Sequence, residues 1–275
     1  MSAATPQATP HRVAIAGASG RMGRMLIEAV LASGDCVLAG ALDRPGSASI
    51  GQDAGGLVGA PCGTKIGADA AKAAAASDVL VDFTLPEGAM EHLAACRKQG
   101  TRMVIGTTGF SEAQKKEIKA AARDTAIVMS PNFSIGVNVA FRLLEIAARV
   151  LDKGYDIEVF EAHHRHKVDA PSGTALRMGE VVAKALGRDL KKVAVYGREG
   201  VTGVRKNETI GFTSVRGGDV VGDHSVMFIG AGERLEVSHR ASSRANFANG
   251  ALRAARFVAR KKSGLFDMAD VLGFK

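Results

Sequence analysis

The sequence predicts an α/β fold class: a Rossmann-type doubly wound parallel sheet with a second α+β domain built on an open mixed sheet. Three observations lead to this expectation. Short apolar runs alternate with helical patterns in the first half, a glycine-rich turn follows the first apolar run, and strand-like segments without intervening helices fill much of the second half. A chain of 275 residues is long enough for two such domains.

Strands and helices alternate regularly in the first half. The expected strands cover residues 12–16, 37–42, 79–83, 103–105 and 126–129. The expected helices cover residues 24–33, 68–76 and 86–98, a further helix is capped by Ser111, and residues 45–63 form a long irregular connection whose role is open. Ligands of such sheets bind at the carboxyl ends of the strands, and five residues are expected along that edge: Gly17, Asp43, Thr84, Gly106 and Asn132.

The pattern changes after residue 134. A long amphipathic helix is expected over residues 135–151, followed by a strand at 155–162 and a helix that ends near Gly187. Three strand-like segments come next, at 210–216, 220–229 and 234–239, and a last helix at 246–261 returns to the first domain. A broad open sheet of this kind often pairs with another subunit, so we expect an oligomer.

A glycine motif follows the first strand. Gly17, Gly20 and Gly23 lie in the segment GASGRMG, directly before a helical pattern, and Asp43 stands at the end of the second strand. Glycines let the backbone approach a pyrophosphate, the helix N-terminus supports its charge, and a carboxylate about 20 residues further on can accept hydrogen bonds from ribose hydroxyls. Although the spacing departs from G-x-G-x-x-G, this context predicts a dinucleotide site.

A basic cluster lies near the middle of the chain. Residues 161–174 read EAHHRHKVDAPSGT and contain three histidines, an arginine and a lysine within five positions, 163–167. A strand leads into the cluster, and Ser172 is the expected N-cap of the next helix. The first N–H groups of that helix, at Gly173 and Thr174, would add to the positive potential. The arrangement predicts an acidic ligand and proton transfer near neutral pH.

Two other interpretations of this cluster are weaker. Taken alone, the run HHRHK would be interpreted as a solvated face, and the adjoining helix start is what favours a functional site. A zinc site is disfavoured because Arg165 and Lys167 would repel a metal cation and no cysteine lies nearby, so no metal is expected.

Composition narrows the class of protein. The net charge is +8, but the positive residues are dispersed and only 5% of residues are aromatic, so no nucleic-acid partner is expected. The three cysteines, Cys36, Cys62 and Cys96, lie outside any C-x-x-C motif, which favours a reducing compartment. The N-terminus lacks the apolar core of a signal peptide and no apolar run is long enough to span a membrane, so we expect a cytoplasmic protein without a membrane partner.

The chain resembles the dihydrodipicolinate reductase family of the bacterial lysine and diaminopimelate pathway. The resemblance runs from Arg12 onward and is carried by the motifs VAIAGASGRMG, VDFTLPEG, MVIGTTGF, SPNFSIGVN, EAHHRHKVDAPSGTA and SGLFDM. It implies NADPH or NADH as cofactor, reduction of a cyclic imine dicarboxylate, and a homotetramer. It also implies a dinucleotide-binding domain over 12–134, a substrate-binding and oligomerisation domain over 135–243, and a C-terminal return to the first domain over 244–275. Residues 1–11, MSAATPQATPH, precede the resemblance and are expected to form a flexible tail.

The resemblance also implies roles for single residues. His163 and Lys167 match the catalytic pair, and the sequence leaves open which of them donates the proton. The substrate contacts implied are His164, Lys167, Gly173 and Thr174. The cofactor contacts implied are Gly17, Ala18, Ser19, Gly20, Arg21 and Met22 at the pyrophosphate, Asp43 and Arg44 at the adenosine ribose, and Gly106, Thr107, Thr108, Ser130, Pro131, Asn132 and Phe133 on the nicotinamide side.

The sequence leaves open the preferred cofactor and two alternative functions. Asp43 replaces a glutamate common in the family, and Arg44 beside it favours a 2′-phosphate, so the preference between NADH and NADPH is undecided. Another oxidoreductase acting on an amino acid or semialdehyde is an alternative, although no cysteine lies near the basic cluster for a thioester mechanism. A non-catalytic nucleotide sensor is the other, although it would not need His163 or Lys167.

Overall fold

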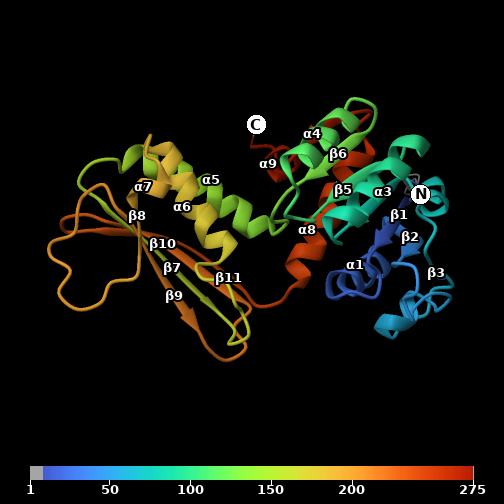
Figure 1. The fold of residues 1–275 in the computed structure, drawn as a ribbon, viewed down its shortest axis with the longest axis horizontal. Coiled ribbons are helices and arrows are strands. Elements are labelled where there is room, and N and C mark those ends of the chain that lie inside the picture. Colours follow the sequence, from blue (N-terminus) through green and yellow to red (C-terminus); the bar gives the residue numbers. More distant parts are fainter. Residues whose placement is uncertain (1–8, 275) are drawn as a thin grey trace, which may run out of the picture. The chain divides into compact units, whose positions relative to one another are not determined.

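The computed structural model describes residues 9–274, which form two compact units. The first unit extends to Ser134 and resumes at Ala245, and the second comprises Ile135–Arg244 (Figure 1). The tail expected over residues 1–11 lies mostly outside the described residues, and His11 already belongs to the first strand.

The first unit contains a seven-stranded sheet in the order β12-β6-β5-β4-β1-β2-β3. Every pairing within it is parallel. The strands are β1 (His11–Ala16), β2 (Cys36–Leu42), β3 (Ile66–Gly67), β4 (Val79–Asp82), β5 (Arg102–Ile105), β6 (Ala126–Met129) and β12 (Gly264–Phe266). The strand order reverses at β1, since β2 and β4 flank it, and ligands of open parallel sheets bind at such a switch point.

Helices cover both faces of this sheet, as a doubly wound fold requires. They are α1 (Arg21–Leu31), α2 (Ala70–Ala76), α3 (Pro86–Gln99), α4 (Glu112–Ala121), α8 (Ala245–Ala259) and α9 (Met268–Leu272), with a short 3-10 helix at Gly55–Val58. Apolar residues of α2, α3 and α4 form one continuous core with the sheet, while α1 and α8 pack together and α8 contacts β4, β5 and β6. Several of these helices begin as their sequences dictate: Ser111 and Gln114 form a capping box at α4, and Pro86 opens α3.

The C-terminal segment adds two elements that the sequence did not predict. After α8, β12 pairs in parallel with β6, with Leu265 opposite Ile127. Asp267 then caps α9 through its carboxylate. The return to the first unit therefore supplies the last strand of its sheet as well as a helix.

The second unit is a mixed five-stranded sheet in the order β11-β10-β7-β9-β8. The strands are β7 (Asp156–His163), β8 (Ala194–Tyr196), β9 (Ile210–Arg216), β10 (Gly222–Ile229) and β11 (Arg234–Ala241). β7, β9 and β8 run parallel, and β10 is antiparallel to both β7 and β11. The fold class expected from the sequence is thus confirmed, except that α7 (Leu190–Val193) and β8 interrupt the stretch expected to hold only later strands.

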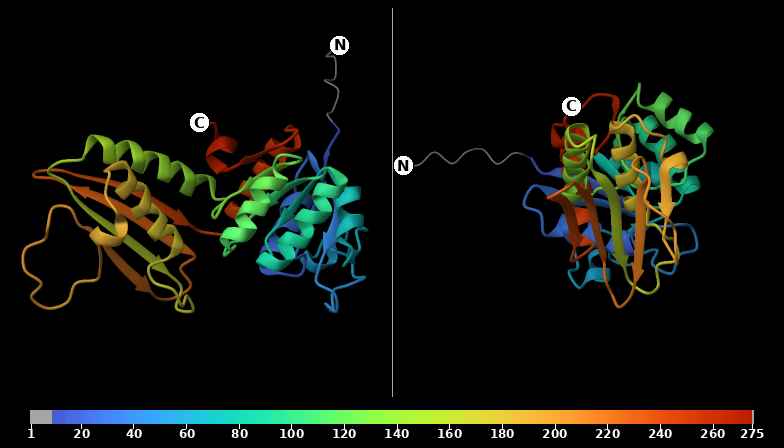
Figure 2. Two further views of the ribbon diagram at one scale, coloured as in Figure 1. Left: turned by 45° about the horizontal axis from the view of Figure 1, so that its top comes forward. Right: turned by 90° about the vertical axis from the view of Figure 1, so that its left-hand side faces the viewer.

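Two helices pack on one face of the five-stranded sheet (Figure 2). α5 (Ile135–Val150) and α6 (Gly173–Ala185) contribute Leu144, Met178 and Val182 to a core with alternate residues of β7 and β10. Residues that alternate with these, such as Glu158, Phe160 and Met227, point to the opposite face. None of the helices between residues 9 and 274 is long and apolar enough to cross a membrane.

Candidate functional site

The glycine motif forms the turn between β1 and α1. Gly17 follows β1 directly and has a φ of +73°, which residues with a Cβ atom rarely adopt. The N–H of Gly20 donates to the Gly17 carbonyl at 2.9 Å, and Gly20 is the N-cap of α1 without any side-chain cap. Gly23 lies so close to this turn that a Cβ there would be 2.0 Å from the Gly17 oxygen. These glycines shape an open backbone cradle at a helix N-terminus, which fits the pyrophosphate of a dinucleotide.

Asp43 lies at the neighbouring strand end. Its Oδ2 accepts hydrogen bonds from Ser19 and, at 3.1 Å, from Ser47, while Oδ1 accepts from the Arg44 N–H at 2.9 Å. Burial raises the pKa of Asp43, but the hydrogen bonds from Ser19, Arg44 and Ser47 outweigh it and lower the pKa below its usual value. The carboxylate is therefore ionised beside the glycine turn, with the exposed side chain of Arg44 next to it. Arg21, the first residue of α1, is also exposed.

The remaining predicted cofactor residues lie at the ends of β5 and β6. Gly106 follows β5 directly, and its N–H donates to the Asp82 carbonyl of β4 at 2.8 Å. The side chains of Thr107 and Phe133 are buried, whereas Thr108 and Pro131 are exposed. Ser130 donates to the Asn132 carbonyl at 2.8 Å, which closes a turn after β6. The parallel sheet thus brings the first-unit residues to one edge, and at Thr107 and Phe133 the buried side chains leave mainly the backbone for contacts.

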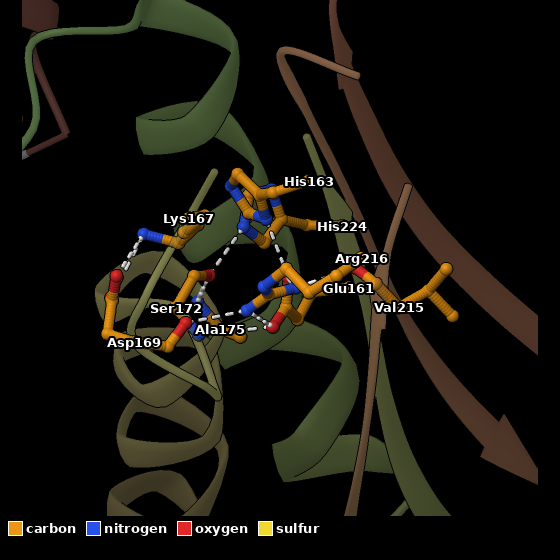
Figure 3. Close-up of polar contacts among 9 residues, drawn as sticks. All are labelled: Glu161, His163, Lys167, Asp169, Ser172, Ala175, Val215, Arg216 and His224. Atoms are coloured by element: carbon orange, nitrogen blue, oxygen red, sulfur yellow. Dashed lines mark hydrogen bonds and ion pairs between the residues drawn. The ribbon is translucent and has the colours of Figure 1, made fainter. Parts of the chain in front are cut away.

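The basic cluster of the second unit is organised by a buried carboxylate, Glu161 (Figure 3). Its Oε2 lies 2.6 Å from Nδ1 of His163 and accepts from Arg216 Nη1 at 2.8 Å. Its Oε1 accepts from Arg216 Nη2 at 2.6 Å and from the Ser172 N–H at 3.3 Å. Since an ionised carboxylate can only accept, Nδ1 of His163 must carry the ring hydrogen, and Nε2 is left to exchange a proton with a ligand.

Strand register explains why these groups meet. Glu161 and His163 are two residues apart on β7 and therefore share a face. Arg216 is paired with His163 across β9, and His224 is paired with Glu161 across β10. The imidazoles of His163 and His224 contact edge to face, with ring centroids 5.0 Å apart.

Burial and hydrogen bonds shift the pKa values of the ionisable groups in this network. Burial raises the pKa of Glu161, but hydrogen bonds from Arg216, Ser214 and His163 lower it to about 2. Burial lowers the pKa of His163, and the Glu161 carboxylate opposes that shift. Burial, helped by the neighbouring His163, lowers the pKa of His224 to about 4. At neutral pH, Glu161 is ionised and His224 is neutral.

Lys167 and the start of α6 complete the cluster. The Lys167 Nζ donates to both carboxylate oxygens of Asp169, at 2.8 and 2.9 Å. Ser172 caps α6 by accepting from the Ala175 N–H at 3.2 Å, and its hydroxyl lies 2.9 Å from Nε2 of His224. Gly173 and Thr174 form the first turn of this helix, as expected from the sequence. His164 follows β7, and its N–H donates to the Val220 carbonyl at 2.7 Å.

Sequence reasoning missed three members of this network: Glu161, Arg216 and His224. Glu161 could have been found, because its position two residues before His163 on a strand places both on one face. Arg216 and His224 belong to other strands, and nothing in the sequence gives their order in the sheet. Within residues 9–274, no group of three His, Cys, Asp or Glu residues is arranged to hold a metal ion.

Comparison with known proteins agrees with this architecture. The family model "Dihydrodipicolinate reductase, N-terminus" matches residues 11–133, and "Dihydrodipicolinate reductase, C-terminus" matches residues 136–272. The 4-hydroxy-tetrahydrodipicolinate reductase of Nitrosomonas europaea is 61% identical, covering 97% of this chain and 100% of its own. The enzyme of the same name from Aromatoleum aromaticum is 64% identical, covering 97% of this chain and 96% of its own.

A solved structure shares the fold. The dipicolinate-bound dihydrodipicolinate reductase of Paenisporosarcina sp. TG-14 superimposes with a TM-score of 0.75 at 24% identity, covering 95% of this chain and 99% of that one. Both family models match, and together they span the two units described above. The chain therefore belongs to the dihydrodipicolinate reductase family.

Proposed function

We propose that this chain catalyses the NAD(P)H-dependent reduction of a dihydrodipicolinate-type cyclic imine dicarboxylate to tetrahydrodipicolinate, a step of lysine and diaminopimelate biosynthesis. The observation that carries the proposal is the ionised Glu161 that holds His163 by Nδ1, beside Lys167 and the start of α6. This arrangement combines a proton-exchanging imidazole with cationic and N–H groups suited to a dicarboxylate. A nucleotide sensor would need neither.

The first unit would hold the cofactor. Its contacts would come from Gly17–Met22 at the pyrophosphate, Asp43 and Arg44 at the adenosine ribose, and residues 106–108 and 130–133 on the nicotinamide side. The reduced nicotinamide supplies a hydride. Asp43 favours the ribose hydroxyls of NADH, whereas the exposed Arg44 favours the 2′-phosphate of NADPH, so both cofactors are expected to serve.

The second unit would hold the dicarboxylate. Lys167, His164 and the first turn of α6 at Gly173 and Thr174 are the proposed contacts. Lys167 is paired with the exposed Asp169, so a substrate carboxylate would have to replace Asp169 as the partner of the ammonium group. Asp169 and the substrate would each offer a carboxylate, so Lys167 would keep an ion pair when one replaces the other.

His163 and Lys167 would serve the proton transfer that accompanies reduction of the ring. Glu161 fixes the imidazole with its hydrogen on Nδ1, so a proton can enter or leave only at Nε2. Burial and the charges of Lys167 and Arg216 lower the pKa of His163 below its usual value, and Glu161 offsets part of that shift by stabilising the imidazolium form. Lys167 supplies a cation that stabilises negative charge developing on the ring after reduction.

Oxidation of NADPH by the purified chain, with freshly prepared dihydrodipicolinate precursor, tests the activity. A folded sample that oxidises NADPH and NADH no faster than the enzyme-free reaction would contradict it. Lys167→Ala and His163→Ala should each lower kcat by about 10²- to 10⁴-fold, the range typical of positioned proton donors. If only KM changed, these residues would be binding rather than catalytic groups.

We also propose a cytoplasmic homotetramer assembled through the second unit. The face of the five-stranded sheet opposite α5 and α6 carries apolar side chains among polar ones, and Val215 on it is 44% exposed. Such a face is suited to pairing with another copy. Analytical ultracentrifugation at micromolar concentration should give the mass of four chains, and a monomer would refute the assembly.

A further inference from the structure

A second buried carboxylate, Asp82, lies in the first unit. Asp82 is the last residue of β4, at the carboxyl edge of the sheet, and its relative exposure is 0%. Its Oδ1 accepts from the Thr84 N–H at 3.0 Å, the Thr84 hydroxyl at 2.8 Å and the Thr107 hydroxyl at 2.7 Å. Its Oδ2 lies 2.5 Å from Nδ1 of His92 on α3.

These contacts tie two loops together. Thr84 belongs to the loop after β4 and Thr107 to the loop after β5, and the Thr84 N–H also reaches the Thr107 hydroxyl at 2.9 Å. The backbone adds a further link, because the Gly106 N–H donates to the Asp82 carbonyl at 2.8 Å. The partners of Oδ1 and the Asp82 carbonyl therefore hold residues 106–107 in place, while Thr108 beyond them is exposed.

Burying an ionised carboxylate is unfavourable unless its surroundings supply hydrogen bonds and a counterion. Asp82 receives its hydrogen bonds from the loops after β4 and β5, at the carboxyl edge of the sheet. Asp78, immediately before the same strand at its amino end, shows the alternative. It is partly exposed and pairs with Arg12 at 2.7 Å, without touching either loop.

We propose that Asp82 is a positioning residue for the nicotinamide cofactor, which acts through Thr84 and Thr107 by holding the loop at 106–108 in its binding conformation. The inference rests on the proposed cofactor role of that loop. Because a hydrogen bond to a charged group is worth more than a neutral one, an amide in place of the Asp82 carboxylate would loosen both threonines. Its effect should fall on the affinity for the cofactor and leave that for the dicarboxylate unchanged.

The test compares Asp82→Asn with Asp78→Asn, two substitutions that remove the same charge from opposite ends of β4. Calorimetric titration with NADPH alone, and with NADH alone, measures binding without turnover. Asp82→Asn should weaken binding of both cofactors by about tenfold or more and raise their KM, with the KM of the dicarboxylate unchanged, whereas Asp78→Asn should bind as wild type. Equal affinities for the folded Asp82→Asn variant and wild type would overturn the inference.

A second pair covers the case in which Asp82→Asn does not fold. Thr107→Val removes the hydroxyl that Asp82 holds, and Thr107→Ser restores it with little change in volume. We expect weaker cofactor binding for the valine variant and recovery for the serine variant. Equal binding by both would also overturn the inference. A wild-type chain that binds neither cofactor would instead overturn the proposed function, and this inference with it.

Discussion

Replacing Glu161 by glutamine should weaken catalysis through the protonation state of His163. Glutamine has nearly the shape of glutamate but carries no charge, and one of its two acceptor oxygens becomes an NH₂ donor. With the amide oxygen facing Arg216 Nη2 and the Ser172 N–H, the NH₂ group would face two donors, Arg216 Nη1 and His163 Nδ1. His163 could then avoid a clash only by moving its hydrogen to Nε2, the atom that has to exchange the proton.

The size of the effect follows from the lost contact. A hydrogen bond to a charged partner contributes about 1.5–3 kcal/mol, and each 1.4 kcal/mol is a factor of about ten. The imidazolium population at a given pH should therefore fall about 10- to 100-fold, and the unpaired Arg216 charge acts in the same direction. We expect kcat/KM for the dicarboxylate at pH 7 to fall by that factor and to recover partly as the pH is lowered.

Glu158→Gln is the matched control. Glu158 lies on the same strand, points to the opposite face and is likewise paired with arginine, in its case Arg198 at 2.8 Å and Arg205 at 3.0 Å. It has no contact with His163, so this variant reports the cost of discharging an arginine-paired carboxylate on β7. Initial rates across pH, with melting temperatures for both variants, separate the two effects. A wild-type pH profile for Glu161→Gln, or the same loss of activity in Glu158→Gln, would refute an action of Glu161 through the protonation state of His163.

Three further outcomes are expected. Asp169→Asn removes the group that competes with a substrate carboxylate for Lys167. Since an exposed ion pair is worth about 0.2–1 kcal/mol, the KM for the dicarboxylate should fall by up to about fivefold, and an unchanged or higher KM would contradict this competition. Arg44→Ala should raise the KM for NADPH and leave the KM for NADH nearly unchanged. In the wild type, the kcat/KM values for the two cofactors should lie within roughly tenfold of each other, and a preference of three orders of magnitude would contradict the assignment of Asp43 and Arg44 to the ribose. The pKa of His224 is lowered to about 4 in the folded state, so unfolded chains bind the proton first and the free energy of unfolding should decrease as the pH falls from about 6.5 toward 4. Denaturant titrations should show a shallower decrease for His224→Gln than for the wild type, and equal slopes would refute His224 as the cause.

Much of the fold could be predicted because its signals are local. The glycine turn, the proline at the start of α3 and the Ser111 cap of α4 each lie within a few residues of the element that they define. The elements that were missed are short. β8 and β12 have three residues each, too few for a periodic pattern, and both exist because they pair with a longer strand already in place.

The candidate site combines residues that are close together in the chain with residues that strand pairing brings to them, and sequence reveals the first kind more readily than the second. His163 and Lys167 stand together in the chain, so their types and spacing alone suggest proton transfer to an acidic ligand. Arg216 reaches Glu161 only because β9 pairs with β7 in the register that places it opposite His163. A slip of one residue would turn the Arg216 side chain to the other face and leave the buried Glu161 without its counterion. Since the state of His163 depends on that carboxylate, the chemistry of the local motif is set by a pairing that the motif itself does not contain.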